Sequence, residues 1–281
     1  IKISGLSHGT DVWINNAQDL ILSGKATIST AICTRDDIMT YLINMGLDPN
    51  ESFKIMENVR KGNVAKNACK EWPEYAEHMR EHNVPDWYID SCRKIKYMFP
   101  KAHAAAYVMM AWRIAYYKIN YPLAYYAAFF SIRATDFSYE MMAQGRAELE
   151  HHLSEYQKKK KNGEKFSAKE EGTLRDMRIV QEFYARGFEF MPIDIFKADA
   201  KYCRIVDGRL MPHIGSIEGM GENAAAGVVE ACKGGPFLSK DDFRERSKVP
   251  STVVDKMSKL GLLGNIPESN QLSIFDYAGE S

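Results

Sequence analysis

Residues 99–107 read Phe99-Pro100-Lys101-Ala102-His103-Ala104-Ala105-Ala106-Tyr107, and they open the longest helix that the sequence predicts. Proline is favoured at the start of a helix, and the helical pattern continues to Lys118. His103 and Tyr107 are four residues apart and therefore share one face. The small alanine side chains around them leave room for another surface to approach. The stretch predicts a helix whose entry is both cationic and uncrowded.

The entry of this helix carries residue types that suit a nucleotide triphosphate. Lys101 lies at the helix start, where the helix dipole already favours anions. A lysine neutralises phosphate charge, a histidine such as His103 hydrogen-bonds phosphate or base, and the ring of Tyr107 can stack. Arg60 and Lys61, at the end of a separate predicted helix, are candidates for further cations. On local features alone, an alanine-rich core helix with exposed basic ends is the alternative.

Helical periodicity covers most of the chain up to residue 187, and caps or prolines mark the helix starts. Thr34 with Asp37 and Ser167 with Glu170 are capping-box signals. The predicted helical segments are residues 34–46, 48–62, 63–84, 85–97, 101–118, 122–132, 136–162 and 167–187. The predicted fold class is therefore mostly α.

The pattern changes after Gly187. Residues 188–210 show short apolar alternation around Pro192 and Asp207-Gly208, which predicts brief strands and a hairpin. We therefore expect a multi-helix domain over residues 1–187, a small α+β region over residues 188–264, and a flexible C-terminal peptide over residues 265–281.

Two glycines in a Gly-x-Gly spacing occur in Ile217-Glu218-Gly219-Met220-Gly221-Glu222-Asn223-Ala224, before an alanine-rich helix. Glycine suits a tight turn between helices. A turn that ends at a helix start exposes unpaired N–H groups, so it can bind a phosphate without a lysine and independently of base sequence. The pattern resembles the helix-hairpin-helix motif, and residues 249–263 resemble a second copy without the turn glycines. An ordinary corner between helices is the alternative.

After Leu263 the apolar periodicity stops, and turn-forming residues lead to Gln271-Leu272-Ser273-Ile274-Phe275. A disordered terminus usually has few large apolar residues, so we interpret Leu272, Ile274 and Phe275 as anchors for a pocket on a partner. The side-chain amide of Gln271 would orient the peptide. Alternatively, the tip folds back on its own domain. The peptide resembles the sliding-clamp-binding peptide of bacterial replication proteins, with Ile274 where leucine is usual.

Charge and cysteine content limit the classes of function. Lys plus Arg and Asp plus Glu number 37 each, so any DNA contact has to be local rather than spread over a uniformly basic surface. The five cysteines include no Cys-x-x-Cys pair, which argues against a zinc ribbon or a disulfide framework. Cys69, His78 and His82 are loosely spaced for a metal site, which stays a minor alternative.

The sequence contains no signal peptide and no long uncharged apolar run. We therefore expect a cytoplasmic location and no membrane partner. Because the sequence begins at Ile1 without a methionine, we also expect it to be a piece of a longer chain.

Three long strings carry a closer resemblance. They are residues 99–107, Trp87-Tyr88-Ile89-Asp90-Ser91-Cys92, and Ile3-Ser4-Gly5-Leu6-Ser7-His8-Gly9-Thr10-Asp11-Val12-Trp13. Together with the helix-hairpin-helix pattern and the terminal peptide, in this order, they resemble the fingers and C-terminal region of PolC-type bacterial DNA polymerase III. The resemblance covers essentially the whole chain. It implies fingers over residues 1–187, a duplex-DNA-binding region over residues 188–264 and a sliding-clamp contact in residues 265–281.

The resemblance also implies three groups of site residues. Residues facing the incoming deoxynucleotide triphosphate (dNTP) are Arg60, Lys61, Lys101, His103 and Tyr107, with Ser7 and His8 as weaker candidates. DNA-binding residues are Gly219, Gly221 and Asn223, and clamp-binding residues are Gln271, Leu272, Ile274 and Phe275. The implied partners are primer-template DNA, dNTP, the sliding clamp (beta subunit) and other replisome subunits.

The implied reaction is two-metal phosphoryl transfer, in which a primer 3′-hydroxyl attacks the α-phosphate of the dNTP. The family carries its catalytic aspartates, and with them Mg²⁺, upstream of the segment that begins here at Ile1. We interpret Asp36-Asp37, Asp194 and Asp241-Asp242 as helix caps or turns, so we expect no catalytic and no metal-binding residue in this chain. Alone it should bind and close but not catalyse. The alternative is a non-catalytic DNA-binding adaptor that tethers a clamp to DNA.

Overall fold

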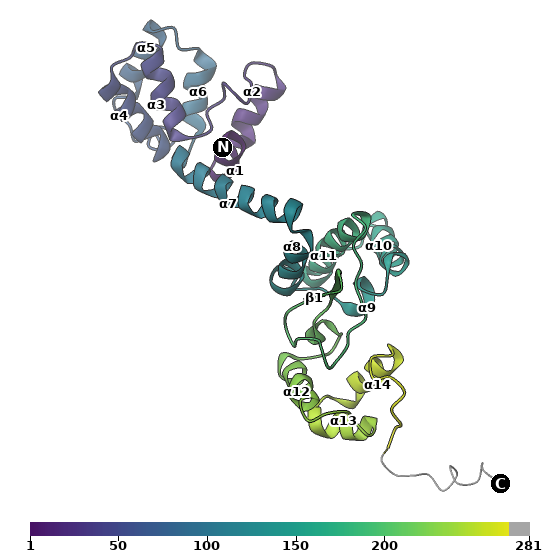
Figure 1. Cartoon of the computed structure of the whole chain (residues 1–281). Coiled ribbons are helices and arrows are strands. Elements are labelled where there is room, and N and C mark those ends of the chain that lie inside the picture. The colour runs from purple at the N-terminus through teal and green to yellow at the C-terminus, as the bar shows by residue number, and fades with distance from the viewer. Residues whose placement is uncertain (270–281) are drawn as a thin grey trace, which may run out of the picture. The chain divides into compact units, whose positions relative to one another are not determined.

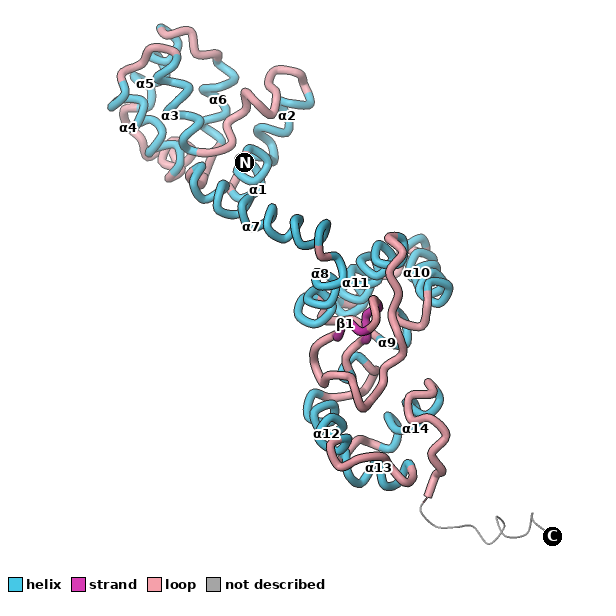
Figure 2. The backbone as a smooth tube through the Cα atoms, viewed as in Figure 1, coloured by secondary structure: helices cyan, strands magenta, loops and turns pink. Residues whose placement is uncertain are grey.

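The computed structural model describes residues 1–269, which divide into two compact units (Figure 1). The first unit is Ile1–Ala115 and the second begins at Tyr116. Helices dominate both units, and the strands of the described chain form one small hairpin (Figure 2). The predicted fold class, mostly α with a small α+β region, is confirmed. The domain boundary predicted near residue 188 from the change of sequence pattern stays a prediction.

The first unit is a cluster of helices around one apolar core. Its elements are α1 (Lys2–His8), η1 (Trp13–Ala17), α2 (Gln18–Leu22), α3 (Arg35–Asn44), α4 (Pro49–Arg60), α5 (Trp72–Glu81), α6 (Asp86–Lys94) and the start of α7 (Lys101–Asn120). α3 and α4 pack closely and bury Ile38, Leu42, Ile55 and Val59. Tyr88 of α6 is buried in the same core. Burial of these side chains stabilises the unit by removing apolar surface from water.

Polar caps fix the starts of α3 and α4. The carboxylate of Asp37 accepts the N–H groups of Thr34 and Cys33 at 2.9 and 3.0 Å. Asp48 accepts the N–H groups of the second and third residues of α4 at 2.9 and 3.0 Å, and Pro49 is the first residue. These contacts satisfy donors that a helix start leaves unpaired.

α7 packs little against the first unit. Ala104 is its single buried residue among those described, and large apolar side chains such as Trp112 are up to 74% exposed. The alternative prediction of an alanine-rich core helix is therefore wrong for this unit. The helix entry nevertheless lies close to α1 and α3, because the ring of His103 contacts that of His8 and the N–H of Lys101 donates to Asp36.

The second unit combines helices, a two-stranded hairpin and a helical end. Its elements are α8 (Pro122–Ala128), η2 (Phe129–Arg133), α9 (Tyr139–Met142), α10 (Arg146–Lys161), α11 (Ala168–Ala185), β1 (Arg204–Val206), β2 (Arg209–Met211), η3 (Ile214–Ser216), α12 (Glu222–Cys232), α13 (Lys240–Ser247) and α14 (Ser251–Lys259). β1 and β2 are antiparallel, with Arg204 opposite Met211. Asp207 and Gly208 join them at φ of 48° and 73°, as the predicted hairpin requires.

The single helix predicted over residues 136–162 is wrong. Gly145 has a φ of 110°, which a right-handed helix does not permit, and it separates α9 from α10. The hydroxyl of Tyr184 accepts the N–H of Gly145 at 3.2 Å and donates to the carbonyl of Met142 at 3.0 Å. A contact from a later helix therefore stabilises the break. The predicted capping box at Ser167 and Glu170 is present at the start of α11.

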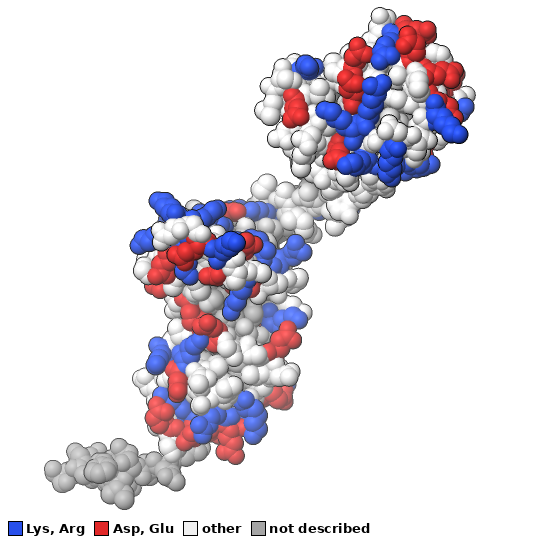
Figure 3. All heavy atoms as spheres, turned by 180° about the vertical axis from the view of Figure 1, so that it is seen from behind, with Lys and Arg blue, Asp and Glu red and all other residues white. Residues whose placement is uncertain are grey.

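Two cores support this unit. One is rich in aromatic rings and lies between α8, α10 and α11, with Tyr126, Phe130 and Phe183 fully buried. The other lies under α12, α13 and α14 and includes Val228, Phe243 and Met257. Acidic and basic side chains both occur over the face seen in Figure 3, and the two signs are equal in number over the whole sequence.

Candidate functional site

The first turn of α7 is seated on the start of α3. The carboxylate of Asp36 accepts the backbone N–H of Lys101 at 2.6 Å. The carbonyl oxygen of Phe99 accepts the backbone N–H of Arg35 at 3.1 Å. One of the free N–H groups of the helix start is thus already satisfied by a carboxylate, which lies beside the lysine. A phosphate at this entry would have to be held by side chains rather than by that amide.

Four aromatic rings gather at the entry of α7. The ring centroid of His8, the last residue of α1, lies 5.4 Å from that of His103 and 5.0 Å from that of Tyr107. His103 stacks on Phe99 with centroids 4.4 Å apart and an interplanar angle of 17°. Tyr107 is 56% exposed, so the cluster opens to solvent. The structure brings together three predicted residues and adds Phe99, to which the sequence analysis gave no role.

The weaker candidates Ser7 and His8 differ in their surroundings. The hydroxyl of Ser7 donates to the carbonyl of Ser4 at 3.0 Å within α1. By contrast, Nδ1 of His8 is buried and has no hydrogen-bond partner among residues 1–269. A buried polar atom without a partner costs free energy, which a ligand can recover by supplying the missing hydrogen bond. His8 is therefore the stronger of the two.

Glu57 holds three cations at the end of α4. Its carboxylate lies 2.5 Å from Nε of Arg60, 3.1 Å from Nζ of Lys61 and 3.5 Å from Nη1 of Arg35. Hydrogen bonding to Arg60 and then to Lys61 lowers the pKa of Glu57 to about 2. Three positive charges share one negative charge, so the cluster keeps a positive excess. Arg35 was missed in the sequence, because its place beside Glu57 depends on the packing of α3 against α4.

Residues 95–99 connect these cations to the entry of α7. The N–H of Met98 donates to the carbonyl of Arg60 at 3.2 Å, and the N–H of Thr10 donates to the carbonyl of Tyr97 at 2.8 Å. Gly62 lies against this segment at a φ of 72°, and a Cβ there would lie 2.2 Å from the carbonyl oxygen of Lys96. The end of α4 and the start of α7 are therefore positioned by shared backbone contacts.

The glycine motif forms a turn that ends at the start of α12. The N–H of Met220 donates to the carbonyl of Ile217 at 3.0 Å, and Gly219 has a φ of 85°. Gly221 caps α12 without a side chain. Among residues 1–269, no acceptor receives the N–H groups of Gly221, Glu222 or Asn223, and all three residues are exposed. These groups are free to bind an anion.

Two charged side chains hold the turn from outside. The N–H of Glu218 donates to the carboxylate of Glu140 in α9 at 3.0 Å. Nζ of Lys256 in α14 donates to the carbonyl of Glu218 at 3.1 Å and to its carboxylate at 2.9 Å. The turn is therefore preorganised by groups that the glycine pattern does not reveal.

The second copy suggested for residues 249–263 contains α14, and a turn between α13 and α14 precedes it. Lys248 has a φ of 60° there, so a lysine adopts the left-handed conformation that glycine usually supplies. α12 approaches this turn closely, because a Cβ on Gly227 would lie 2.4 Å from the carbonyl oxygen of Ser247.

Three other predictions concern caps, metals and the tail. Asp36 and Asp37 act as helix caps, and Asp194 accepts the N–H of Phe196 in a turn. The side chains of Cys69, His78 and His82 do not converge, and the described part of the chain has no group of three His, Cys, Asp or Glu that could hold a metal ion. The predicted clamp-binding residues are Gln271, Leu272, Ile274 and Phe275, and they lie outside the described residues.

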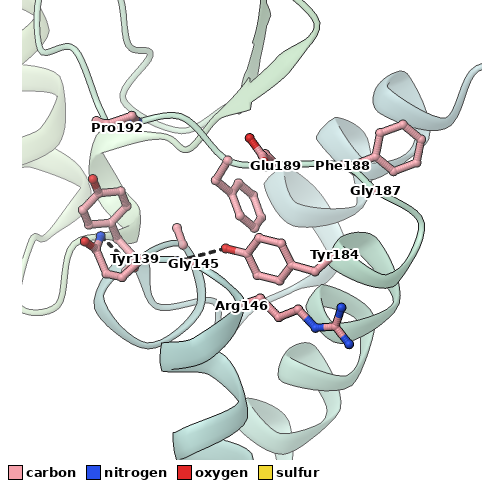
Figure 4. Close-up of a pocket in the computed structure, with 11 residues that line it drawn as sticks. Tyr139, Gly145, Arg146, Tyr184, Gly187, Phe188, Glu189 and Pro192 are labelled. Carbon is pink, nitrogen blue, oxygen red and sulfur yellow. Dashed lines mark hydrogen bonds between the residues drawn. The ribbon is translucent and has the colours of Figure 1, made fainter.

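A pocket of about 420 Å³ lies in the second unit between the start of α10, the end of α11 and residues 187–192 (Figure 4). Gln144, Arg146 and Glu189 are polar residues of its lining. Burial raises the pKa of Tyr184, which also lines it, to about 12. No predicted site residue within residues 1–269 lines this pocket.

Two family models and several curated proteins match this chain. Residues 1–83 match the family model of the bacterial DNA polymerase III alpha subunit finger domain, and residues 187–272 match a helix-hairpin-helix motif. The chain is 50% identical over 276 residues to PolC-type DNA polymerase III of Streptococcus pyogenes serotype M5 (strain Manfredo). It has the same identity to the proteins of serotypes M1 and M18 (strain MGAS8232).

Each of these matches covers 98% of this chain and 19% of the relative, so the chain spans about a fifth of the length of the curated relatives it matches. No helix in the described residues is both long and apolar enough to cross a membrane. Of the three strings that suggested the resemblance, residues 3–13 lie within the finger-domain match, and the other two lie between the two family-model matches. The chain therefore belongs to the PolC-type DNA polymerase III family, as a segment that contains the finger-domain and helix-hairpin-helix regions.

Proposed function

We propose that this chain is the part of a replicative DNA polymerase that binds the incoming dNTP and the primer-template DNA. The observation that carries the proposal is the convergence at the α7 entry, where His8, His103 and Tyr107 form one cluster. The alternative of a non-catalytic adaptor gives this cluster no role.

The dNTP would be held by side chains. Lys101, Arg60 and Lys61 supply positive charge for the triphosphate, and Arg35 joins them through Glu57. The exposed ring of Tyr107 can stack on the base or sugar, while His8 and His103 can hydrogen-bond phosphate. Because Asp36 occupies the N–H of Lys101, the lysine side chain rather than the helix end provides the first contact with an anion.

Chemistry on the α-phosphate needs Mg²⁺, which acts as a Lewis acid in two-metal phosphoryl transfer. The described residues contain no group of three or more His, Cys, Asp or Glu side chains that could hold a metal ion. We therefore propose that the catalytic residues belong to other parts of a longer polymerase, and that this chain binds and closes without catalysing alone.

The duplex would be held by backbone groups. The free N–H groups of Gly221, Glu222 and Asn223 suit phosphate oxygens, and contacts of this kind position a protein without reading sequence. Tethering by Gln271, Leu272, Ile274 and Phe275 to the sliding clamp would raise the effective concentration of the polymerase on DNA. A cytoplasmic replisome with further subunits is the setting that we propose.

The test is steady-state incorporation of dNTP by the full-length polymerase with Lys101→Ala. Loss of one charge-assisted contact is expected to lower kcat/KM for dNTP, through a higher KM or a lower kcat, by a factor that corresponds to about 1–3 kcal/mol. Lys70→Ala is a matched control, because Lys70 is an exposed lysine without an ion pair among residues 1–269. Unchanged kinetics in Lys101→Ala would remove this residue from the site, and a full-length chain that incorporates no dNTP would favour the adaptor.

A further inference from the structure

Basic side chains concentrate where α10 ends and α11 begins. Residues 158–178 contain eight Lys or Arg and four Asp or Glu, in a chain with a formal net charge of zero. We define the α10–α11 corner as Lys158, Lys160, Lys161, Lys165 and Lys169. All five are exposed, and none makes an ion pair within the described part of the chain. Their neighbour Lys159 is different, since its ammonium lies 3.2 Å from the carboxylate of Glu170.

The corner has a fixed backbone. Gly163 turns the chain at a φ of 73°, and the N–H of Glu164 donates to the carbonyl of Lys159 at 3.1 Å. Ser167 and Glu170 cap the start of α11. Below the turn, α10 and α11 pack on one another through buried side chains of the aromatic-rich core. The five lysines of the corner therefore lie on a folded part of the second unit.

The number of lysines exceeds what the helix itself requires. The carbonyl end of a helix carries only about half a negative charge, which one lysine can balance. Each residue of a helix points about 100° away from the one before it. Lys158–Lys161 therefore spread around the end of α10 and do not lie along one face. Like charges at this density repel each other unless an external anion neutralises them. The corner therefore fits a polyanion.

The start of α11 is linked to the glycine turn of the helix-hairpin-helix motif through residues 136–140. Gly172 of α11 lies against Asp136, because a Cβ on this glycine would meet the Asp136 carboxylate. A few residues later, the carboxylate of Glu140 accepts the N–H of Glu218 in the turn at 3.0 Å. The base of the corner and the turn whose free N–H groups suit phosphate therefore contact the same short segment.

We propose that the α10–α11 corner is a second contact for the phosphate backbone of the duplex, in addition to the glycine turn. The inference rests on the proposed duplex-binding function. A nucleic acid is favoured over an acidic protein because its charges repeat at short, regular intervals and can neutralise several unpaired lysines at once. Such contacts depend on charge and not on base sequence, so the corner would add affinity without adding specificity.

The test uses the full-length polymerase with Lys158→Gln, Lys160→Gln and Lys161→Gln combined. Binding to a primer-template DNA is measured between about 50 and 200 mM salt, where phosphate contacts weaken steeply. We expect the Kd to rise roughly tenfold at low salt and the slope of log Kd against log salt to fall by about one for each lysine engaged. Lys54→Gln, Lys66→Gln and Lys70→Gln combined form the matched control, because these lysines are exposed and unpaired among residues 1–269.

The Gly221→Ser variant, measured in the same experiment, separates this inference from the proposed function. One outcome is that Gly221→Ser weakens binding while the lysine variant keeps the affinity and salt slope of the unmodified protein. The proposal that the corner binds DNA is then overturned, and an acidic protein becomes the partner to test for these lysines. If the lysine variant loses affinity while Gly221→Ser does not, the corner stands and the turn is wrong. If neither variant loses affinity, both proposals fail.

Discussion

The entry of α7 takes its groups from four segments that are far apart in the sequence, whereas the glycine turn takes its N–H groups from residues 221–223 alone. At the entry, Glu57 gathers Arg35, Arg60 and Lys61, and Asp36 receives the N–H of Lys101. In the turn, the backbone conformation of Gly219 and Gly221 exposes the donors directly. The first site is made of side-chain charge and the second of backbone geometry.

This difference predicts different sensitivities. A site of side-chain charge should respond to pH, to salt and to the loss of a distant packing contact. A site of backbone donors should respond to any added side-chain atom that blocks or satisfies them, while pH has little effect. The three substitutions below test these sensitivities, from the largest expected effect to the smallest.

Gly62→Ala should give the largest effect, because it disrupts the backbone contact between the end of α4 and the segment before α7. The new Cβ would lie 2.2 Å from the carbonyl oxygen of Lys96, at a φ of 72° that favours glycine. We expect a loss of about 3 kcal/mol in the free energy of unfolding of the first unit. All four tryptophans lie at or before residue 112, so tryptophan fluorescence of the 281-residue chain in urea reports on this unit.

Gly24→Ala is the control for Gly62→Ala. Gly24 has the same φ of 72° but nothing within 4 Å of a Cβ, so it measures backbone strain alone, about 1 kcal/mol. Equal losses in the two variants would show that the contact with Lys96 does not hold α4 to the entry.

The turn was more accessible to sequence reasoning than the entry. Gly-x-Gly before an alanine-rich helix is a local signal, and the structure has the turn and the helix start where this signal lies. What sequence could not reveal is that Glu140 and Lys256 hold the turn, since those contacts span many residues. The same limit hid Arg35 and Asp36 at the entry, because their roles depend on how α3 packs. Asp36 was correctly predicted to be a cap, although it caps α7 and not its own helix.

The predicted helix over residues 136–162 shows why a local pattern can fail. Its charged periodicity continues across Gly145, and an isolated glycine costs a helix only about 1 kcal/mol. The hydroxyl of Tyr184 forms hydrogen bonds with Met142 and Gly145, on the two sides of the break. These contacts with a residue about 40 positions later offset the local preference for a continuous helix. The start of α11 was predictable because Ser167 and Glu170 satisfy each other within one turn.

Glu57→Gln should give an intermediate effect that depends on pH. The pKa of Glu57 is lowered from 4.5 to about 2 by its cations, so its stabilisation is fully present above pH 4.5 and is lost as pH falls toward 2. We expect the variant to lose on the order of 2 kcal/mol at neutral pH and to converge with the unmodified chain in acid. The measurement is urea unfolding by tryptophan fluorescence at several pH values.

Glu81→Gln is the control for Glu57→Gln, because Glu81 is an exposed carboxylate without an ion pair among residues 1–269. A pH-independent difference would show that Glu57 acts through packing and not through charge.

Gly221→Ser should give the smallest effect and the one that most sharply separates the two sites, because stability and binding should change in opposite directions. Gly221 has a φ of −74° and open space around a Cβ, so serine fits without strain. A serine at this position accepts the N–H of the second or third helical residue, Asn223 or Ala224, neither of which has a described acceptor, and this should stabilise α12 by a few tenths of a kcal/mol. That same N–H would then no longer be free for phosphate, so duplex affinity should fall by about 1 kcal/mol, roughly fivefold.

Gly221→Ala is the control for Gly221→Ser, because it adds the Cβ but no hydrogen-bond acceptor. Duplex titration of both variants in the full-length polymerase therefore distinguishes a blocked donor from simple bulk, and equal affinity for Gly221→Ser and the unmodified protein would mean that the free N–H groups do not contact DNA.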